Sequence, residues 1–367
     1  MRVLACNSPY GQGGIGQHFA QLVEESRADG LLGRYFAYSV KPGDENVGRV
    51  LAPSRWDRAL VEYTPLRWSP GWKNYTINER YDRQVAAALQ GPLSRFMGFA
   101  GKSLHAFRRA RELGANCLEL IAPNSHVENV FRLHARAAAD SGLADSWLNR
   151  TQLRKTLREY EVADRIYVHS DYVRDSFLAA GIPPAKLRRT DLHVAPRFRP
   201  PRHRPSDDVF RVVYVGRLDA TKGVPLLLDV FDRLDVPTKE LTLVGGWATR
   251  GMRTFMAPWL RRPDLRHAPG DPLPALHAAD VFVHPSYEDG FGYAPTEALA
   301  CGVPVVVTED TGMKEHVREG RNGFVVPTGS ADDLLDRLRT IAGRPLARTH
   351  SLLPSAPSPS PSSIPSR

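Results

Sequence analysis

Two basic residues, Arg217 and Lys222, lie five positions apart after a predicted strand. The apolar run Phe210 to Gly216 precedes them, and the helical run Val224 to Leu234 follows. Because open α/β sheets bind ligands at the carboxyl ends of their strands, two cations here are well placed to bind a diphosphate. A diphosphate that leaves a sugar gains negative charge, which two fixed cations can stabilise without Mg²⁺. Surface side chains that flank a turn are the alternative interpretation.

Two carboxylates, Asp289 and Glu297, lie eight positions apart in a second motif. A buried run ends at Pro285, Asp289 lies in the loop that follows, and a helical run with Glu297 extends from Pro295 to Gly302. Carboxylates accept hydrogen bonds from vicinal hydroxyls, so one can hold a hexose and the other a ribose. Taken singly, a turn residue and a helix-dipole carboxylate are the ordinary interpretations.

The loop between these carboxylates contains Gly290 and Gly292 on either side of Phe291. Glycine has no side chain, so its backbone N–H group can approach a ligand closely. We therefore expect the loop amides and the two carboxylates to face one cleft, where they would bind a sugar.

A glycine-rich turn follows the first predicted strand, Arg2 to Cys6. The sequence Gly11-Gln-Gly13-Gly14-Ile-Gly16 precedes the helical run His18 to Ser26, so bare amides and a helix N-terminus are available for a phosphate. The spacing also matches the dinucleotide fingerprint G-x-G-x-x-G. That fingerprint needs an acidic residue at the end of the second strand, and the run Arg34 to Val40 has none. A phosphate loop and a simple tight turn both remain open.

Short β-branched or aromatic runs alternate with longer helical runs along the whole chain, which is typical of βαβ units. The predicted strands of the first half are Arg2 to Cys6, Arg34 to Val40, Phe96 to Ala100, Cys117 to Ala122 and Arg165 to Ser170. Those of the second half are Phe210 to Gly216, Leu241 to Gly245, Val281 to Pro285, Val303 to Thr308 and Phe324 to Pro327. Two parallel sheets are therefore predicted.

A chain of 367 residues, 42% of them hydrophobic, is long enough for two cores, since single cores rarely exceed about 250 to 300 residues. The segment 196–208 is rich in proline and charge and predicts a linker. It would join an N-terminal acceptor-binding domain, residues 1–195, to a C-terminal donor-binding domain, residues 209–345. Residues 346–367, rich in serine and proline, are predicted to be disordered.

The positive charge is concentrated in the first half of the chain. Residues 1–205 hold 31 Lys+Arg and 20 Asp+Glu, a net +11, and the rest hold 18 and 20, a net −2, within a total of +9. An anionic membrane surface or an anionic acceptor is an expected partner of the first half, and solvated arginine is the alternative. No zinc-knuckle, RNA-binding or helix-turn-helix pattern accompanies the charge, so nucleic acid is not an expected partner.

The cysteines and the apolar stretches indicate the cellular compartment of the protein. Cys6, Cys117 and Cys301 form no metal-ligand or disulfide spacing, which favours a reducing compartment. The apolar stretches are too short for a signal peptide or a bilayer span. The sequence therefore predicts a cytoplasmic protein, with peripheral contact at the inner face of the membrane as the expectation from the charge.

From about Tyr167 to Asp336 the sequence resembles the family 4 glycosyltransferases, which are retaining enzymes of the GT-B fold. Their E-x7-E motif corresponds to Asp289 and Glu297, with Asp in the first position and Glu288 directly before it. The resemblance implies that Glu297 binds the nucleotide ribose. It also implies that Asp289, or Glu288 in its place, holds the donor sugar together with the loop amides.

The same resemblance implies roles for the remaining motifs. Arg217 and Lys222 would clamp the donor diphosphate, and the Gly14 amide of the first glycine turn would meet its distal phosphate. His126 corresponds to a histidine that hydrogen-bonds the donor sugar, and a purely structural histidine is the alternative. No metal ion and no cofactor are expected; a UDP- or GDP-linked sugar would serve as co-substrate.

We therefore predict an α/β GT-B protein whose two Rossmann-like domains carry parallel sheets that face each other across a cleft. Its predicted activity is transfer of a hexose, with retention and without a protein nucleophile, to a saccharide, lipid or small-molecule acceptor. Two alternatives share the donor contacts: a nucleotide-sugar epimerase or hydrolase, and a catalytically silent nucleotide-sugar-binding protein. The second is suggested by Asp289 and by the lack of the C-terminal helix that packs on the first domain in the family.

Overall fold

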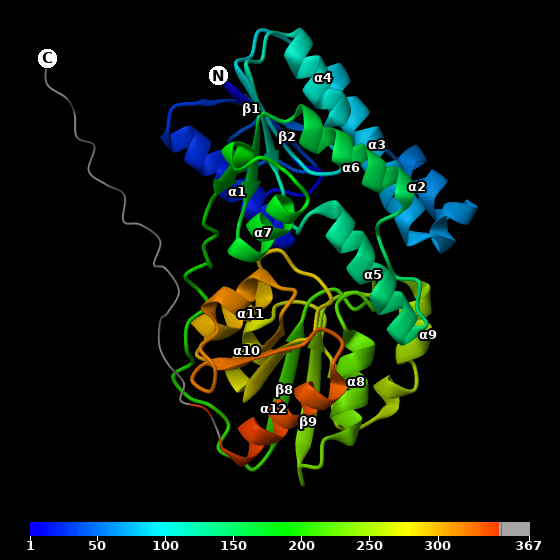
Figure 1. Ribbon diagram of the computed structural model, residues 1–367, viewed down its shortest axis with the longest axis vertical. Helices are drawn as coiled ribbons and strands as arrows, with labels where there is room; N and C mark the ends of the chain where they lie inside the picture. The colour runs from blue at the N-terminus through cyan, green and yellow to red at the C-terminus, as the bar shows by residue number, and fades with distance from the viewer. Residues whose placement is uncertain (345, 347–367) are drawn as a thin grey trace, which may run out of the picture.

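The computed structural model describes residues 1–344 and Leu346, so the predicted disordered tail lies outside the described residues except for Leu346. Two α/β domains lie one above the other in Figure 1, each built on one parallel sheet. This architecture confirms the predicted fold class. Among the described residues, no helix is both long enough and apolar enough to cross a bilayer.

The N-terminal sheet has seven parallel strands in the order β3-β2-β1-β4-β5-β6-β7. Its strands are β1 Arg2–Ala5, β2 Leu32–Ala37, β3 Gly48–Val50, β4 Arg95–Phe99, β5 Cys117–Ile121, β6 Arg165–Val168 and β7 Leu187–Arg189. The helices of this domain are α1 Gly13–Ala28, α2 Arg55–Glu62, η1 Pro65–Trp68, α3 Pro70–Ala88, α4 Leu104–Glu112, α5 Val127–Ser141, α6 Arg150–Val162, α7 Asp171–Ala179 and η2 Pro184–Lys186. The sequence did not predict β3 and β7, three-residue edge strands too short to show a pattern.

The C-terminal sheet has six parallel strands in the order β10-β9-β8-β11-β12-β13. Its strands are β8 Phe210–Val215, β9 Lys239–Val244, β10 Leu265–His267, β11 Val281–His284, β12 Val305–Thr308 and β13 Gly323–Val326. The helices of this domain are α8 Val224–Arg233, α9 Arg250–Met256, η3 Trp259–Arg261, α10 Leu273–Ala278, α11 Tyr293–Ala300, η4 Gly312–His316 and α12 Ala331–Gly343. The sequence did not predict the short edge strand β10.

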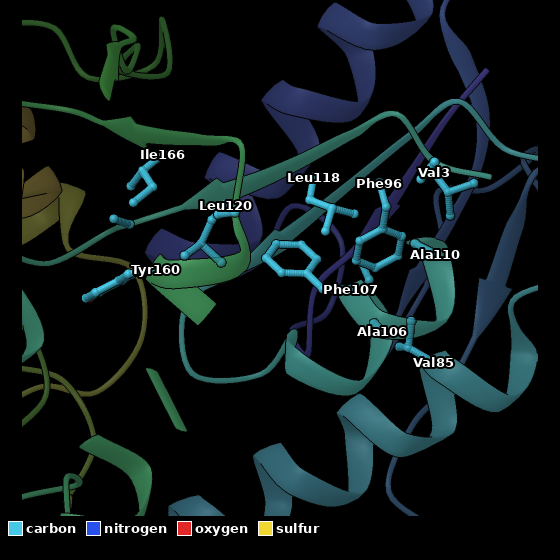
Figure 2. Packing of buried hydrophobic residues seen from close by; sticks show 14 of the residues in the cluster. Val3, Val85, Phe96, Ala106, Phe107, Ala110, Leu118, Leu120, Tyr160 and Ile166 are labelled. Atoms are coloured by element: carbon cyan, nitrogen blue, oxygen red, sulfur yellow. The ribbon is translucent and has the colours of Figure 1, made fainter. Parts of the chain in front are cut away.

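Buried aromatic and aliphatic side chains hold the helices on the N-terminal sheet. Figure 2 shows Phe96 of β4 facing Phe107 of α4, whose rings meet edge to face with centroids 5.9 Å apart. Leu118 of β5 and Ala110 of α4 pack beside them. Full burial of a side chain of this size contributes about 1.5–3 kcal/mol. This packing fixes α4 against β4 and β5.

The chain between the two sheets contains neither helix nor strand over residues 190–209, and the predicted linker, residues 196–208, lies within this stretch. Phe198 is only 5% exposed and packs in the core of the C-terminal domain with Cys301 and Val303. The start of the linker is therefore anchored to the second domain. Cys6 and Cys301 are buried, Cys117 is half-buried, and all three are free thiols.

Candidate functional site

Lys222, Asp289 and His284 meet at the carboxyl edge of the C-terminal sheet. Lys222 lies in the turn after β8, and the other two come from the end of β11 and the loop beyond it, next to β8 in the sheet. The Asp289 Oδ2 atom lies 2.8 Å from Lys222 Nζ and 3.1 Å from His284 Nε2. Burial acts to raise the pKa of Asp289, but the Lys222 ammonium and the His284 bond outweigh it and hold the pKa well below its ordinary value. Asp289 is therefore a fixed, ionised acceptor.

The buried carboxylate of Asp219 positions both predicted cations. Its Oδ2 atom pairs with Arg217 Nε, while its Oδ1 atom accepts the Lys222 backbone N–H at 2.8 Å and the Thr221 hydroxyl at 2.7 Å. One fully buried acid thus fixes the turn from which both cations project. The sequence interpretation missed Asp219. The pattern that could have identified it is an acidic residue between two cations, directly after a predicted strand.

Glu288 points away from this cluster and into the N-terminal domain. It is 1% exposed, and its two carboxylate oxygens accept hydrogen bonds from Asn124 Nδ2 at 2.7 Å and from the Ser125 backbone N–H at 2.8 Å. Burial raises its pKa. Because both oxygens are occupied, Glu288 bridges the two domains, and Asp289 is the acid beside Lys222.

The Gly290–Gly292 loop is packed directly against the N-terminal domain. A β-carbon added at Gly290 would lie 2.0 Å from the Pro123 carbonyl oxygen. Ser170 Oγ donates a 2.7 Å hydrogen bond to the Gly290 carbonyl oxygen. Within the described part of the chain, the backbone amides of residues 290–292 have no hydrogen-bond acceptor. Binding of a sugar by these amides stays a prediction, while Phe291 is buried edge-on against Tyr293.

The first glycine turn faces the start of α11 across the cleft. A β-carbon added at Gly14 would lie 3.4 Å from the Tyr293 ring, at van der Waals contact, so the turn and the start of α11 are close neighbours. One added at Gly16 would lie 2.3 Å from the Pro9 carbonyl oxygen, so Gly16 is required by packing within the turn. Gly13 has a φ of 63°, in the left-handed region that favours glycine. The turn therefore places the N-terminus of α1 opposite the helix that carries Glu297.

Glu297 does not contact the Lys222 and Asp289 cluster; it lies on α11 and is 7% exposed. Burial raises its pKa to about 7, the Arg197 guanidinium partly opposes the shift, and Asp271 adds to it. Between pH 4.5 and 7 the folded protein retains a proton that the unfolded chain has lost, so this group lowers the free energy of unfolding as the pH rises through that window. The predicted site thus contains one permanently ionised acid and one that titrates near neutrality.

His126 lies at the N-terminal end of α5 and is 4% exposed. Its ring packs against Tyr160 and Phe177, with centroid distances of 5.1 and 5.2 Å. Burial lowers its pKa, and its backbone N–H donates to Ser176 Oγ at 2.8 Å. Each of these partners belongs to the N-terminal domain. A hydrogen bond from His126 to a donor sugar therefore stays a prediction.

One group of side chains among the described residues has the spacing of a metal site: Glu79, Asp82 and His105. The Lys155 ammonium lies 2.8 Å from Glu79 and 2.7 Å from Asp82, so a lysine already supplies the positive charge. Asp82 also accepts the His105 and Ala106 backbone N–H groups at the start of α4. These contacts give the group a structural role inside the N-terminal domain.

Comparison with solved structures identifies the fold. Sucrose-phosphate synthase from Thermosynechococcus elongatus superposes with a TM-score of 0.70 over 94% of this chain and 90% of that one, at 19% sequence identity. WaaG, a glycosyltransferase involved in lipopolysaccharide biosynthesis, gives a TM-score of 0.67 over 94% and 91% of the two chains, at 15% identity. The fold is therefore that of the GT-B glycosyltransferases, as the sequence predicts.

Sequence comparison shows which proteins parts of the chain resemble. Residues 197–349 match the family model described as Glycosyl transferases group 1, which confirms the resemblance to the glycosyltransferases. The D-inositol 3-phosphate glycosyltransferase of Kribbella flavida is 31% identical over 213 residues, 51% of this chain and 50% of that relative. The GDP-mannose-dependent alpha-(1-6)-phosphatidylinositol monomannoside mannosyltransferase of Mycolicibacterium smegmatis is 32% identical over 235 residues, 55% of this chain and 60% of that relative. The chain thus matches half to three fifths of these relatives' length.

Proposed function

We propose that this protein is a retaining glycosyltransferase that moves a hexose from a UDP- or GDP-linked sugar to an acceptor hydroxyl. The observation that carries the proposal is the cluster at the carboxyl edge of β8 and β11. There Asp219 fixes Arg217 and Lys222, and Lys222 contacts the ionised Asp289. The relatives named above support a nucleotide-sugar donor, since one of them is described as GDP-mannose-dependent.

In the proposed reaction the bond between the anomeric carbon and the diphosphate oxygen breaks first. Arg217 and Lys222 stabilise the negative charge that the diphosphate gains, and their fixed positions remove the cost of reorienting water around it. Asp289 accepts hydrogen bonds from the sugar hydroxyls and the 290–292 amides donate to the sugar. The acceptor hydroxyl then attacks the same face of the ring and passes its proton to the departing diphosphate oxygen, so the configuration is retained.

A screen of nucleotide diphosphates and nucleotide sugars by thermal shift tests the donor assignment. A ligand that binds the folded state raises the melting temperature by mass action, so UDP or GDP compounds should do so and NAD should not. Labelled donor incubated with and without saccharide acceptors then separates transfer from the epimerase and hydrolase alternatives. Free sugar or an epimer in both tubes would favour those alternatives, and no shift with any nucleotide would reject the donor site.

The elevated pKa of Glu297 predicts that donor affinity depends on pH. If the ionised carboxylate binds the ribose hydroxyls, affinity should rise as the pH increases through about 7 and level off above it. Titration calorimetry with UDP and GDP between pH 5.5 and 8.5 measures this, and Glu297→Gln should flatten the dependence. A wild-type affinity that falls across this range would contradict the ribose assignment.

Metal-ion removal should leave turnover unchanged, because Arg217 and Lys222 carry the charge that Mg²⁺ carries in other transferases. The measurement is the initial rate of sugar transfer before and after exhaustive dialysis against a chelator. A large loss of rate that Mg²⁺ or Mn²⁺ restores would contradict the two-cation mechanism.

A further inference from the structure

A groove of about 920 Å³ opens between the domains beside the proposed reaction centre. Its N-terminal wall comes from α2, η1 and α3, and its C-terminal wall from the loop after β9 and the start of α9. Asp145, which follows α5, ties the two walls together, because its carboxylate accepts the Ala220 backbone N–H at 3.0 Å and pairs with the Thr249 hydroxyl. In Figure 1 the end of α5 lies beside α9 on the right of the molecule.

The walls of the groove carry cations that face each other from the two domains. Arg67 and Lys73 come from the N-terminal wall, Arg250 and Arg253 come from the C-terminal wall, and all four are exposed. None of them has an ion-pair partner among residues 1–344. The lining has two acids, but the Asp145 carboxylate is already hydrogen-bonded and only Glu62 is exposed. A concave surface lined mainly by one sign of charge concentrates oppositely charged ligands.

Three tryptophans line the same groove. Trp68 of η1 is 63% exposed, with the Arg67 guanidinium 3.9 Å from its ring centroid, and Trp147 and Trp247 are half-buried. The electron-rich face of an aromatic ring packs well against the C–H face of a pyranose ring. Exposed cations and aromatic side chains in one groove therefore match a chain of sugars that carries negative charge.

The groove reaches one of the two proposed diphosphate cations. Arg217 lines it, whereas Lys222, Asp289 and Glu297 do not. The predicted ribose site lies on the other side of the C-terminal domain, with α10 and α11, which Figure 1 shows on the left. A molecule that fills the groove would thus end beside the departing diphosphate, on the side away from the nucleoside.

We propose that this groove is the acceptor site and that the acceptor is an oligosaccharide bearing acidic groups. Its role as acceptor site rests on the proposed glycosyltransferase function. A lipid surface fits less well, because Trp147 and Trp247 are recessed between two domains and the cations oppose each other across the groove. A flat membrane could reach only one wall.

Titration calorimetry on the full chain tests the proposal with two hexasaccharides of equal length, oligogalacturonate and neutral maltohexaose. We expect the acidic chain to bind more tightly, and its affinity to fall as salt is raised to 0.5 M, since exposed charges are screened within about 3–10 Å. The double variant Arg250→Ala/Arg253→Ala should weaken this binding about tenfold, and Trp68→Ala should weaken both chains. Arg266→Ala, which removes an exposed arginine of the same domain outside the groove, is the matched control.

Nucleotide-induced thermal shift, measured on the same variants, separates this inference from the proposed function. Groove variants that lose saccharide binding and keep the nucleotide shift support the acceptor site. Loss of the nucleotide shift would assign the groove to the donor instead, and equal binding of both hexasaccharides would reject an acidic acceptor.

Binding to phosphatidylserine vesicles that Trp68→Ala abolishes, without binding of oligogalacturonate, would overturn the proposal in favour of a membrane surface. Oligogalacturonate binding without any nucleotide shift would keep the groove as a site for acidic saccharides and reject both the glycosyltransferase and the role of the groove as its acceptor site.

Discussion

Replacing Lys222 with alanine is expected to lower kcat/KM for sugar transfer by about 10²- to 10³-fold, the usual cost of removing one fixed group that stabilises transition-state charge. Lys222 Nζ is 2.8 Å from Asp289 and 3.0 Å from the Glu288 carbonyl oxygen, so the ammonium is held in place before the donor binds. Its loss removes charge from the diphosphate site and leaves the Asp289 carboxylate with His284 as its remaining side-chain partner among the described residues. Steady-state kinetics with the donor identified by the thermal-shift screen provide the measurement.

Two controls distinguish a loss of catalysis in Lys222→Ala from a loss of stability. Lys186→Ala removes another lysine that bonds backbone carbonyls, at a site remote from the cleft, and should keep the wild-type rate. A thermal melt of Lys222→Ala should show a folded protein at the assay temperature. If the folded variant turns over at more than about a third of the wild-type rate, Lys222 does not stabilise the leaving group.

Gly290→Ala should disrupt the closed arrangement of the two domains. The added methyl would lie 2.0 Å from the Pro123 carbonyl oxygen, and because the obstacle is backbone, no side-chain rotation relieves the clash. Overpacking costs about 1–3 kcal/mol, which corresponds to about a 5- to 150-fold shift away from the closed state. Adjacent Glu288 would also lose its bonds to Asn124 and Ser125. We expect kcat to fall by the same factor as the population of the closed state, and X-ray scattering to show a larger radius of gyration.

Gly246→Ala is the matched control for this substitution. Gly246 also follows a strand of the C-terminal sheet, its β-carbon would meet nothing within 4 Å, and its φ lies outside the left-handed region. It should keep the wild-type radius of gyration and thermal stability. Equal effects from the two alanine variants, or an active and compact Gly290→Ala protein, would show that Gly290 is not a point of close approach between the domains.

The alternation of apolar and helical runs predicted the two parallel sheets. All ten predicted strands are present, because buried strands of a parallel sheet form continuous apolar runs such as Val281–His284. The edge strands β3, β7 and β10 were missed. Strands such as Gly48–Val50 and Leu187–Arg189 are three residues long and hold a single aliphatic side chain each, so pairing with a neighbour defines them and sequence pattern does not.

The approach of Lys222 to Asp289 follows from the same reasoning, because both lie just past the carboxyl ends of strands. The residues that contact Lys222 and Asp289 are harder to predict from the sequence. Asp219 and His284 carry residue types with many ordinary uses, and their roles depend on distances of 3.1 Å or less that only the folded chain defines. Glu288 and Asp289 are neighbours in sequence, yet the backbone turns their side chains toward different domains.

The sequence by itself determined the chemistry available at one edge of the second sheet: two cations, two acids and a run of glycines, each placed by local strand, turn and helix signals. Tertiary structure alone decided which of these groups meet. It directed Glu288 to Asn124 across the domain boundary, set Glu297 apart from Asp289, and brought Arg67 and Lys73 opposite Arg250 and Arg253. The physical reason is that local propensity depends on near neighbours in the chain, whereas contact between domains depends on how two separately formed surfaces fit, which no single segment encodes.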